Sequence, residues 1–212
     1  MYKKLDEAAI ENLLEAGIDE FANNGLDRAN INHIAKNAGM SVGVIYKYFE
    51  DKDGFFLACV EHSLKLLEVA IEEVLHNEDD VVRCMELLIA ELMNGAEKHQ
   101  NYYIMYNEIT SGSCQKYAEE LARQIEGKTS MIYAKLLEKA KQEGKASFNG
   151  NPKMFAFFFD SLLMMLQYSF SCKYYKERLK IFCGEEVFEN KDMLAEKFLE
   201  FMKQAIGIRE EV

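Results

Sequence analysis

The sequence of 212 residues has one proline, twelve glycines and no tryptophan, so few positions interrupt a regular backbone. It also lacks any sustained alternation of apolar and polar residues, which is the pattern of a half-buried strand. Apolar residues recur instead at spacings of three and four, as they do in amphipathic helices. We therefore expect an all-α protein with about nine helices and no β-sheet.

Sequence signatures of catalysis are missing too. There is no glycine-rich nucleotide loop, no G-x-S-x-G elbow and no H-E-x-x-H pair. The four histidines are scattered; His62 and His99 could each contact a ligand, although a solvated or capping role is more ordinary. We expect no catalytic residues, no metal site and no cofactor, so an enzyme is the least favoured class.

The five cysteines are odd in number, far apart and without metal-ligand spacing. Reduced thiols in a cytoplasm are the expectation, and a redox sensor is the rarer alternative. The first residues are charged throughout and lack the apolar segment of a signal peptide. The most apolar later stretch, residues 154–170, is interrupted by Asp160, Ser161 and Gln167, so we do not expect it to span a membrane.

Basic residues are outnumbered, 25 against 36 acidic residues, which gives a net charge of −11. Such a chain would repel DNA unless its charges are unevenly distributed. From Arg28 to Phe49 there is no Asp or Glu, while Arg28, Lys36 and Lys47 are present. A local basic face of this kind predicts docking on DNA with strong salt sensitivity.

Residues 30–49, NINHIAKNAGMSVGVIYKYF, have the pattern of two short helices joined by a tight turn. Asn30 is a good N-cap for the first helix, because its side chain can accept from a free amide of the first turn. Gly39 can adopt the left-handed conformation that ends a helix. Ser41 is positioned to cap the second helix.

The second helix has an unusual outward face. Ile45 and Phe49 are one turn apart and point inward, which leaves Gly43 and Lys47 outward, with Val44 and Tyr46 on the flanks. A glycine allows close approach, a tyrosine hydroxyl can bond a phosphate, and a valine can contact a thymine methyl group. The pattern is that of a helix-turn-helix whose second helix enters the major groove.

These residues resemble the DNA-binding signature of the tetracycline-repressor (TetR) family of bacterial transcription regulators. The resemblance covers about Leu5 to Phe56 and departs at Val44, where the family often has Thr or Asn. The matching residues are Ile34-Ala35, Ala38-Gly39, Ser41, Gly43, Tyr46-Lys47-Tyr48-Phe49 and Lys52.

The resemblance implies roles for the individual residues and a division of the chain. The DNA-binding helix-turn-helix domain is expected in residues 1–51, and a helical ligand-binding and dimerisation domain in residues 52–212. The residues implied to hold phosphates are Asn30, Tyr46, Tyr48 and Lys52. Those implied to face bases are Asn32, Val42, Gly43, Val44 and Lys47. Ser41 is the implied cap of the helix that carries the last four of them.

The Met and aromatic residues of the second domain are either core or the wall of a pocket, and the resemblance implies a pocket. Carboxylates within apolar runs, at Glu91, Glu108 and Asp160, are costly unless paired. A small apolar or aromatic effector, which could be cationic, is therefore expected. The candidate ligand-binding residues are Tyr102, Tyr103, Tyr106, Glu108, Tyr133, Asp160, Met164 and Tyr168.

Two helices are expected to form the interface of a homodimer. The segment Pro152–Phe170 is apolar nearly all round, and Asp192–Ile206 carries an apolar stripe. A surplus apolar face usually has a partner, although an ordinary intramolecular core is the alternative. The resemblance implies a four-helix bundle made by two subunits. The candidate interface residues are Phe155, Phe158, Leu162, Met165, Leu194, Phe198, Phe201 and Met202.

The leading hypothesis is therefore a ligand-responsive repressor that a small effector releases from a pseudo-palindromic double-stranded DNA operator. The helix that starts at Lys52 would carry the signal between the domains. The alternative is a helical dimer that binds a small molecule without specific DNA binding, which Val44 and the net negative charge favour.

Overall fold

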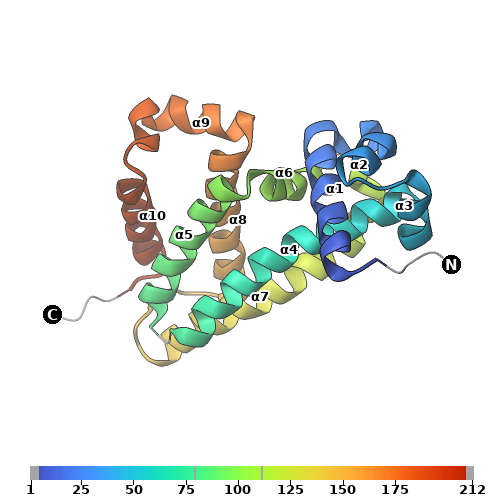
Figure 1. Ribbon diagram of the computed structural model, residues 1–212. Helices are drawn as coiled ribbons and strands as arrows, with labels where there is room; N and C mark the ends of the chain where they lie inside the picture. The colour runs from blue at the N-terminus through green and yellow to red at the C-terminus, as the bar shows by residue number, and fades with distance from the viewer. Residues whose placement is uncertain (1–4, 79, 111, 209–212) are drawn as a thin grey trace. The chain divides into compact units, whose positions relative to one another are not determined.

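The computed structural model describes residues 5–78, 80–110 and 112–208, apart from the side chains of residues 66, 75, 76 and 128. These described residues form ten α-helices and two short 3-10 helices, and they contain no strand (Figure 1). The all-α prediction is confirmed.

The helices follow one another with short connections. Their bounds are α1 Glu7–Arg28, α2 Ile31–Asn37, α3 Val42–Phe49, α4 Lys52–Asn77, α5 Val81–Lys98, α6 Gln100–Glu108, η1 Gly112–Tyr117, α7 Ala118–Gln142, α8 Pro152–Ser171, α9 Lys173–Cys183, η2 Glu185–Phe188 and α10 Lys191–Ala205.

The chain forms two compact units. The first unit contains residues 1–67 and His99–Ala118, and the second contains Glu68–Lys98 and residues 119–212. The sequence suggested a boundary between residues 51 and 52. Packing places the start of α4, together with α6, in the first unit, because both of these segments contact α1.

The core of the first unit is aromatic where α1 meets α4. The Phe21 ring lies 5.8 Å from that of Phe55 and 5.2 Å from that of Phe56, and all three side chains are fully buried. A Cβ atom on Gly17 would lie 2.6 Å from both the Phe55 ring and the Cys59 sulfur. Glycine at this position therefore lets the start of α4 pack closely on α1.

Helix α1 has a break at Gly25, where the backbone adopts φ 71° and ψ 170°. One more helical turn follows the break, as far as Arg28. A Cβ atom on Gly25 would lie 2.7 Å from a carboxylate oxygen of Glu108 at the end of α6. Gly25 is thus favoured chiefly by its positive φ, because the Glu108 side chain could move away from a Cβ atom.

The second unit is built around α5 and α8. Helix α5 packs against α8 and α10, and α8 also packs against α9. Helix α8 is long and apolar enough to cross a membrane by length and composition, with a mean hydropathy of 1.2. Half of that apolar window is buried within the protein, as it is in a core helix of a folded domain.

Candidate functional site

Helix α2 and the turn after it have the predicted geometry. The Asn30 side-chain oxygen accepts from the Asn32 amide at 2.9 Å, so Asn30 caps α2. Gly39 has a φ of 66°, and the next amide, that of Met40, donates to the Ala35 carbonyl at 2.8 Å. These bonds satisfy the free carbonyls at the end of α2 and set the direction in which α3 starts.

Ser41 corrects one expectation. Its backbone is extended and it occupies the N-cap position of α3, but its side chain makes no capping hydrogen bond. The Val44 amide donates to the Ser41 carbonyl at 3.0 Å instead. The Ser41 side chain is exposed at the amino terminus of α3.

Helix α3 buries one side and exposes the side that the sequence predicts. Ile45 is fully buried, whereas Tyr46 is 43% exposed and Gly43 and Lys47 are exposed. A Cβ atom on Gly43 would meet only the Ser41 hydroxyl, at 4.0 Å. Packing within the chain therefore does not require a glycine at position 43.

Two of the residues implied to hold phosphates make bonds within the first unit. The Tyr48 hydroxyl accepts from the Leu5 amide at 2.7 Å. The Lys52 ammonium donates to the Asp27 carbonyl at 2.9 Å. Each bond fixes the side chain and leaves it at least one further proton to donate, since a phenol has its own O–H and an ammonium has three N–H groups.

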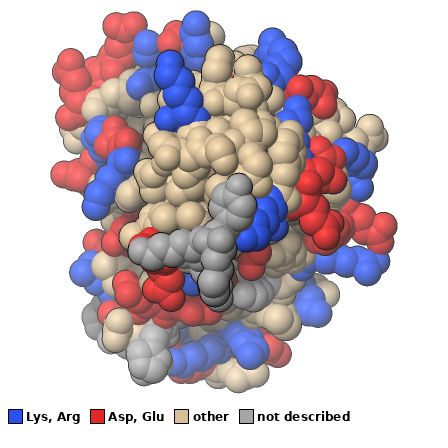
Figure 2. Space-filling model, turned by 45° about the vertical axis from the view of Figure 1, so that its right-hand side comes forward, with Lys and Arg blue, Asp and Glu red and all other residues tan. Residues whose placement is uncertain are grey.

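Residues 30–49 have no carboxylate of their own, but acidic residues adjoin them. The Glu20 carboxylate accepts from the Asn30 amide at 2.9 Å and lies 3.9 Å from the His33 ring. The exposed Glu50 and Asp51 follow α3 directly. Figure 2 turns forward the side that carries α2 and α3. It shows a broad area free of Lys, Arg, Asp and Glu, bordered by charged side chains. A polyanion can approach such a face without strong repulsion.

Residues 13–59 match the family model of bacterial regulatory proteins of the tetR family. Over these residues the chain is similar to the TetR family. An uncharacterised helix-turn-helix transcriptional regulator of Bacillus subtilis, YvdT, is 32% identical over 95 residues, which are 45% of this chain and 49% of YvdT. The match thus spans about half the length of this curated relative.

Solved structures of the TetR family share the fold over nearly the whole chain. A tetR-family regulatory protein from Rhodococcus RHA1 aligns with a TM-score of 0.74 and 15% identity, covering 97% of this chain and 100% of that one. FadR from Bacillus subtilis, in complex with stearoyl-CoA, aligns with a TM-score of 0.70 and 16% identity, covering 93% and 99%. At these identities the likeness shows a shared fold.

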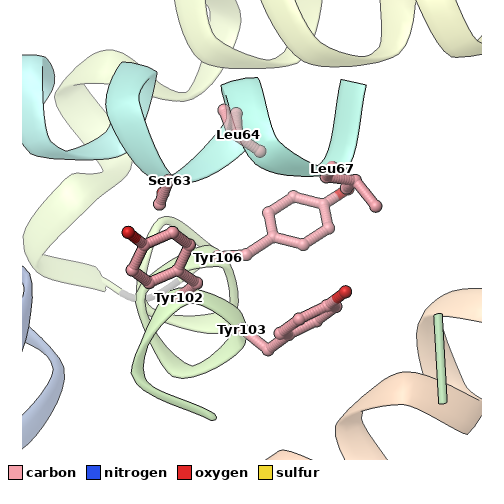
Figure 3. A pocket seen from close by; sticks show the side chains of 6 residues that line it. All are labelled: Ser63, Leu64, Leu67, Tyr102, Tyr103 and Tyr106. Carbon is pink, nitrogen blue, oxygen red and sulfur yellow. The ribbon is translucent and has the colours of Figure 1, made fainter. Parts of the chain in front are cut away.

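A small cavity lies in the first unit between α4 and α6 (Figure 3). Its volume is about 20 Å³ for a water-sized sphere, which is room for about one water molecule. Figure 3 shows three tyrosines reaching it from α6 and three residues reaching it from α4. The three tyrosines are among the ligand-binding residues predicted from the sequence, and that role stays a prediction. The three α4 residues are not among them, because they occupy ordinary positions of a helix. The lining residues are Ser63, Leu64, Leu67, Tyr102, Tyr103 and Tyr106.

Tyr102 also connects the cavity to α1. Its hydroxyl donates to the Glu15 carboxylate, which lies 3.0 Å from the His62 ring nitrogen of α4. Burial, and then the hydrogen bond to Glu15, raise the pKa of Tyr102 above its ordinary value. His62 was a possible ligand contact by sequence, and the structure shows it bonded to Glu15, 47 residues away in the chain.

The other carboxylates that the sequence singled out lie elsewhere. The Glu108 carboxylate lies against Gly25 and accepts from the Ser113 hydroxyl at 2.9 Å, so it does not line the tyrosine cavity. Glu91 is exposed on α5. The expectation of a costly carboxylate within an apolar run is wrong for Glu91, because its side chain lies on the solvent side of the helix.

Four further candidate ligand residues belong to the second unit. Asp160 on α8 is largely buried, and that burial, with the nearby negative charge of Glu126, raises its pKa to about 7. Tyr133 is buried with its ring 5.4 Å from that of Phe159, and burial and the charge of Asp160 raise its pKa. Met164 and Tyr168 follow Asp160 at intervals of four residues along α8. The predicted ligand residues thus fall into two groups, one in each unit.

The predicted interface residues are mostly accessible. Phe158 is 49% exposed, Met165 36% and Phe201 57%. Met202 is the exception, because at 2% exposure it belongs to the core of the second unit. Phe155, Leu162, Leu194 and Phe198 are half-buried. The structure adds further exposed apolar side chains that sequence analysis did not select: Met154, Phe157 and Met193.

Proposed function

We propose that this protein is a ligand-responsive DNA-binding transcriptional regulator that acts as a repressor. The observation that carries the proposal is the exposed face of α3. This face has no acidic residue, and Gly43 on it is not needed for packing within the chain. A glycine that the chain itself does not require suits close approach of a DNA backbone or base edge.

The proposed contacts divide into two kinds. Residues at the ends of the helices hold phosphates, including Asn30, Tyr46, Tyr48 and Lys52, and the Ser41 hydroxyl can join them at the amino terminus of α3. Residues on α2 and α3 face bases: Asn32, Val42, Gly43 and Val44 on the first turns, and Lys47 on the last turn of α3. Phosphate contacts position the protein, and base contacts give it sequence preference.

We further propose that the protein acts in the cytoplasm as a homodimer on a pseudo-palindromic operator. The exposed side chains of α8 lie on one stripe, because Met154, Phe158 and Met165 are four and seven residues apart. On α10, Met193 and Phe201 are eight residues apart and also share a side. A second copy would cover both helices, and its two-fold symmetry would match two half-sites in DNA.

A small apolar or aromatic effector would release the operator. FadR from Bacillus subtilis, which has a similar fold, was solved in complex with stearoyl-CoA. That complex supports control of this protein by an effector. Helix α4 begins directly after α3 and continues without a break into the second unit, so a change along it can reach both. Effector and operator would weaken each other by the same factor, with a coupling of about 1–3 kcal/mol.

Lys47 provides the direct test. Lys47→Ala should weaken operator binding roughly tenfold or more, since a hydrogen bond to a charged group contributes about 1.5–3 kcal/mol. The matched control is Lys135→Ala on the exposed side of α7, which removes the same charge far along the chain. Fluorescence anisotropy on DNA from the gene's own upstream region measures both variants. Equal losses in the two variants would contradict the proposed interface.

A further inference from the structure

The start of α4 carries acidic groups beside a residue that is proposed to hold a phosphate. That residue is Lys52, and three carboxylates lie next to it in the sequence, those of Glu50, Asp51 and Asp53. A carboxylate close to a phosphate weakens the contact, because like charges repel at short range. The residues around this end of the helix therefore have more negative than positive charge by sequence order alone.

The structure brings a second lysine to the same place. Lys116 lies in η1, 63 residues after Asp53, and its ammonium pairs with the Asp53 carboxylate. The Tyr117 hydroxyl donates to the same carboxylate at 2.5 Å. All three residues belong to the first unit. The bond from Lys116, and then the bond from Tyr117, lower the pKa of Asp53 below its ordinary value, so its carboxylate is ionised at neutral pH.

The position of Lys116 is fixed by its surroundings. Cys114, two residues earlier, is fully buried, and η1 packs against α1. The Lys116 ammonium also lies 4.9 Å from the centre of the Tyr117 ring, where a cation is attracted to the face of the ring. The Lys116 side chain is nevertheless 57% exposed, against 28% for Asp53. A polyanion in solution therefore meets the cation of this pair more readily than the anion.

We propose that Lys116 is a positioning residue for DNA binding, which neutralises Asp53 so that the start of α4 can approach a phosphate. The proposal rests on the proposed function and adds to it a residue from outside the recognition motif. An acidic residue in the first turn stabilises a helix through the helix dipole. Asp53 thus supports α4, and Lys116 removes the repulsion that this carboxylate would otherwise exert on DNA.

The fold itself should depend little on this ion pair. An exposed pair of this kind contributes little to stability, because water and salt screen its charges. Lys116→Met keeps the apolar stem and removes the charge, so we expect it to unfold at nearly the temperature of the parent protein. Differential scanning fluorimetry checks this before DNA binding is compared.

Lys116→Met should weaken operator binding, because it leaves the Asp53 carboxylate uncompensated beside the proposed phosphate contact. We expect a loss of roughly three- to tenfold at about 50 mM salt, which shrinks by about 200 mM salt as the charges are screened. Fluorescence anisotropy on DNA from the gene's own upstream region measures the affinity. A loss of the same size at both salt concentrations would indicate a change in structure and would overturn the proposal.

Rescue of the variant tests the role of Asp53. Asp53→Asn, added to Lys116→Met, removes the uncompensated carboxylate and should restore affinity to within about twofold of the parent protein. Lys116→Arg keeps the charge and should bind operator like the parent protein. A lysine that contacted DNA directly would not be replaced by Asp53→Asn. Failure of that rescue would therefore overturn the proposal.

Two controls separate charge from packing. Tyr117→Phe removes the other hydrogen bond to Asp53 without a change of charge, so operator affinity should stay close to that of the parent protein. Lys65→Met removes the same charge from an exposed position of α4, about 20 Å further along the helix. At that distance salt screens the effect on the start of α4. Equal losses in Lys65→Met and Lys116→Met would contradict a local action of Lys116.

The wild-type protein separates this inference from the proposed function. A preference for operator that Lys116→Met retains at full affinity would overturn the inference alone. The absence of any preference in the wild-type protein would contradict the proposed function. The variants are then compared on a random-sequence duplex, where binding is electrostatic. Weaker binding by Lys116→Met that Asp53→Asn restores would support the role of Lys116 there, and equal binding would overturn it.

Discussion

The recognition motif of the first unit and the exposed helices of the second unit both present side chains that one chain does not need for its own packing. On α3 these are small and polar residues around Gly43 and Tyr46, in a stretch without carboxylates. On α8 and α10 they are Phe and Met side chains such as Phe158 and Phe201. The first set suits a polyanion, and the second suits an apolar partner such as a second copy.

The two surfaces differ in how the amino-acid sequence specifies them. The motif depends on neighbours in sequence, because Asn30 caps α2 through Asn32, and Gly39 ends the helix only a few residues later. The exposed residues of α8 depend on which side of the helix α5 and α9 cover, and that is decided by tertiary packing. Local signals therefore identify the first surface and only suggest the second.

Breaking the dimer should have the largest effect on DNA binding. Phe158→Glu places a charge on the proposed interface, so we expect a monomer in analytical ultracentrifugation. Operator affinity should fall by about 100-fold or more, since two linked half-site contacts are replaced by one. The control is Phe182→Glu on α9. The Phe182 side chain is 74% exposed and is not one of the proposed interface residues. A dimeric Phe158→Glu protein with normal affinity would contradict the assignment.

Asp160 should control the stability of the second unit with pH. Its folded-state pKa of about 7 lies above the ordinary 3.8, so the folded state holds a proton that the unfolded state has lost. Stability should therefore fall as pH rises from about 4 to about 7, and then level off. Asp160→Asn should remove this dependence and raise the melting temperature at pH 8 by roughly 5–10 °C.

The control for Asp160→Asn is Glu91→Gln, which removes a carboxylate that is exposed on α5. Differential scanning fluorimetry between pH 5 and pH 8 measures both variants. At pH 5 only about a third of the fall in stability between pH 4 and pH 7 has taken place, so the gain from the Asn variant should be clearly smaller there than at pH 8. A gain of the same size at pH 5 and pH 8 would show that the titration of Asp160 is not its source.

Replacing Gly25 or Gly127 with alanine should have smaller effects, which are opposite in sign, on the free energy of unfolding. Gly25→Ala forces a side chain into a left-handed conformation and against Glu108, so we expect a loss of about 1–3 kcal/mol in unfolding free energy. Gly127→Ala in α7 meets nothing within 4 Å, and should add roughly 0.5–1 kcal/mol through helix propensity. Urea unfolding measures both. An unchanged unfolding free energy in Gly25→Ala would mean that the break in α1 does not depend on a glycine.

The sequence predicts the all-α fold and the recognition motif because both are specified by short-range patterns. It misses α9, whose residues include none that is buried, so there is no core stripe to detect. It also misses Glu15 as the partner of His62 and Tyr102, because these residues are 47 and 87 positions away. Ser41 shows a further limit: a residue suited to capping can occupy the cap position without making the bond.

We propose above that a dimer of this chain reads two half-sites through α3. The most direct test is the affinity of the wild-type protein for a pseudo-palindrome from its own upstream region, compared with the same DNA with one half-site scrambled. Titrations between about 50 and 200 mM salt would show the expected linear fall of log affinity with log salt. We predict roughly 100-fold tighter binding to the intact site. Equal affinity for the two DNAs at every salt concentration would contradict the account.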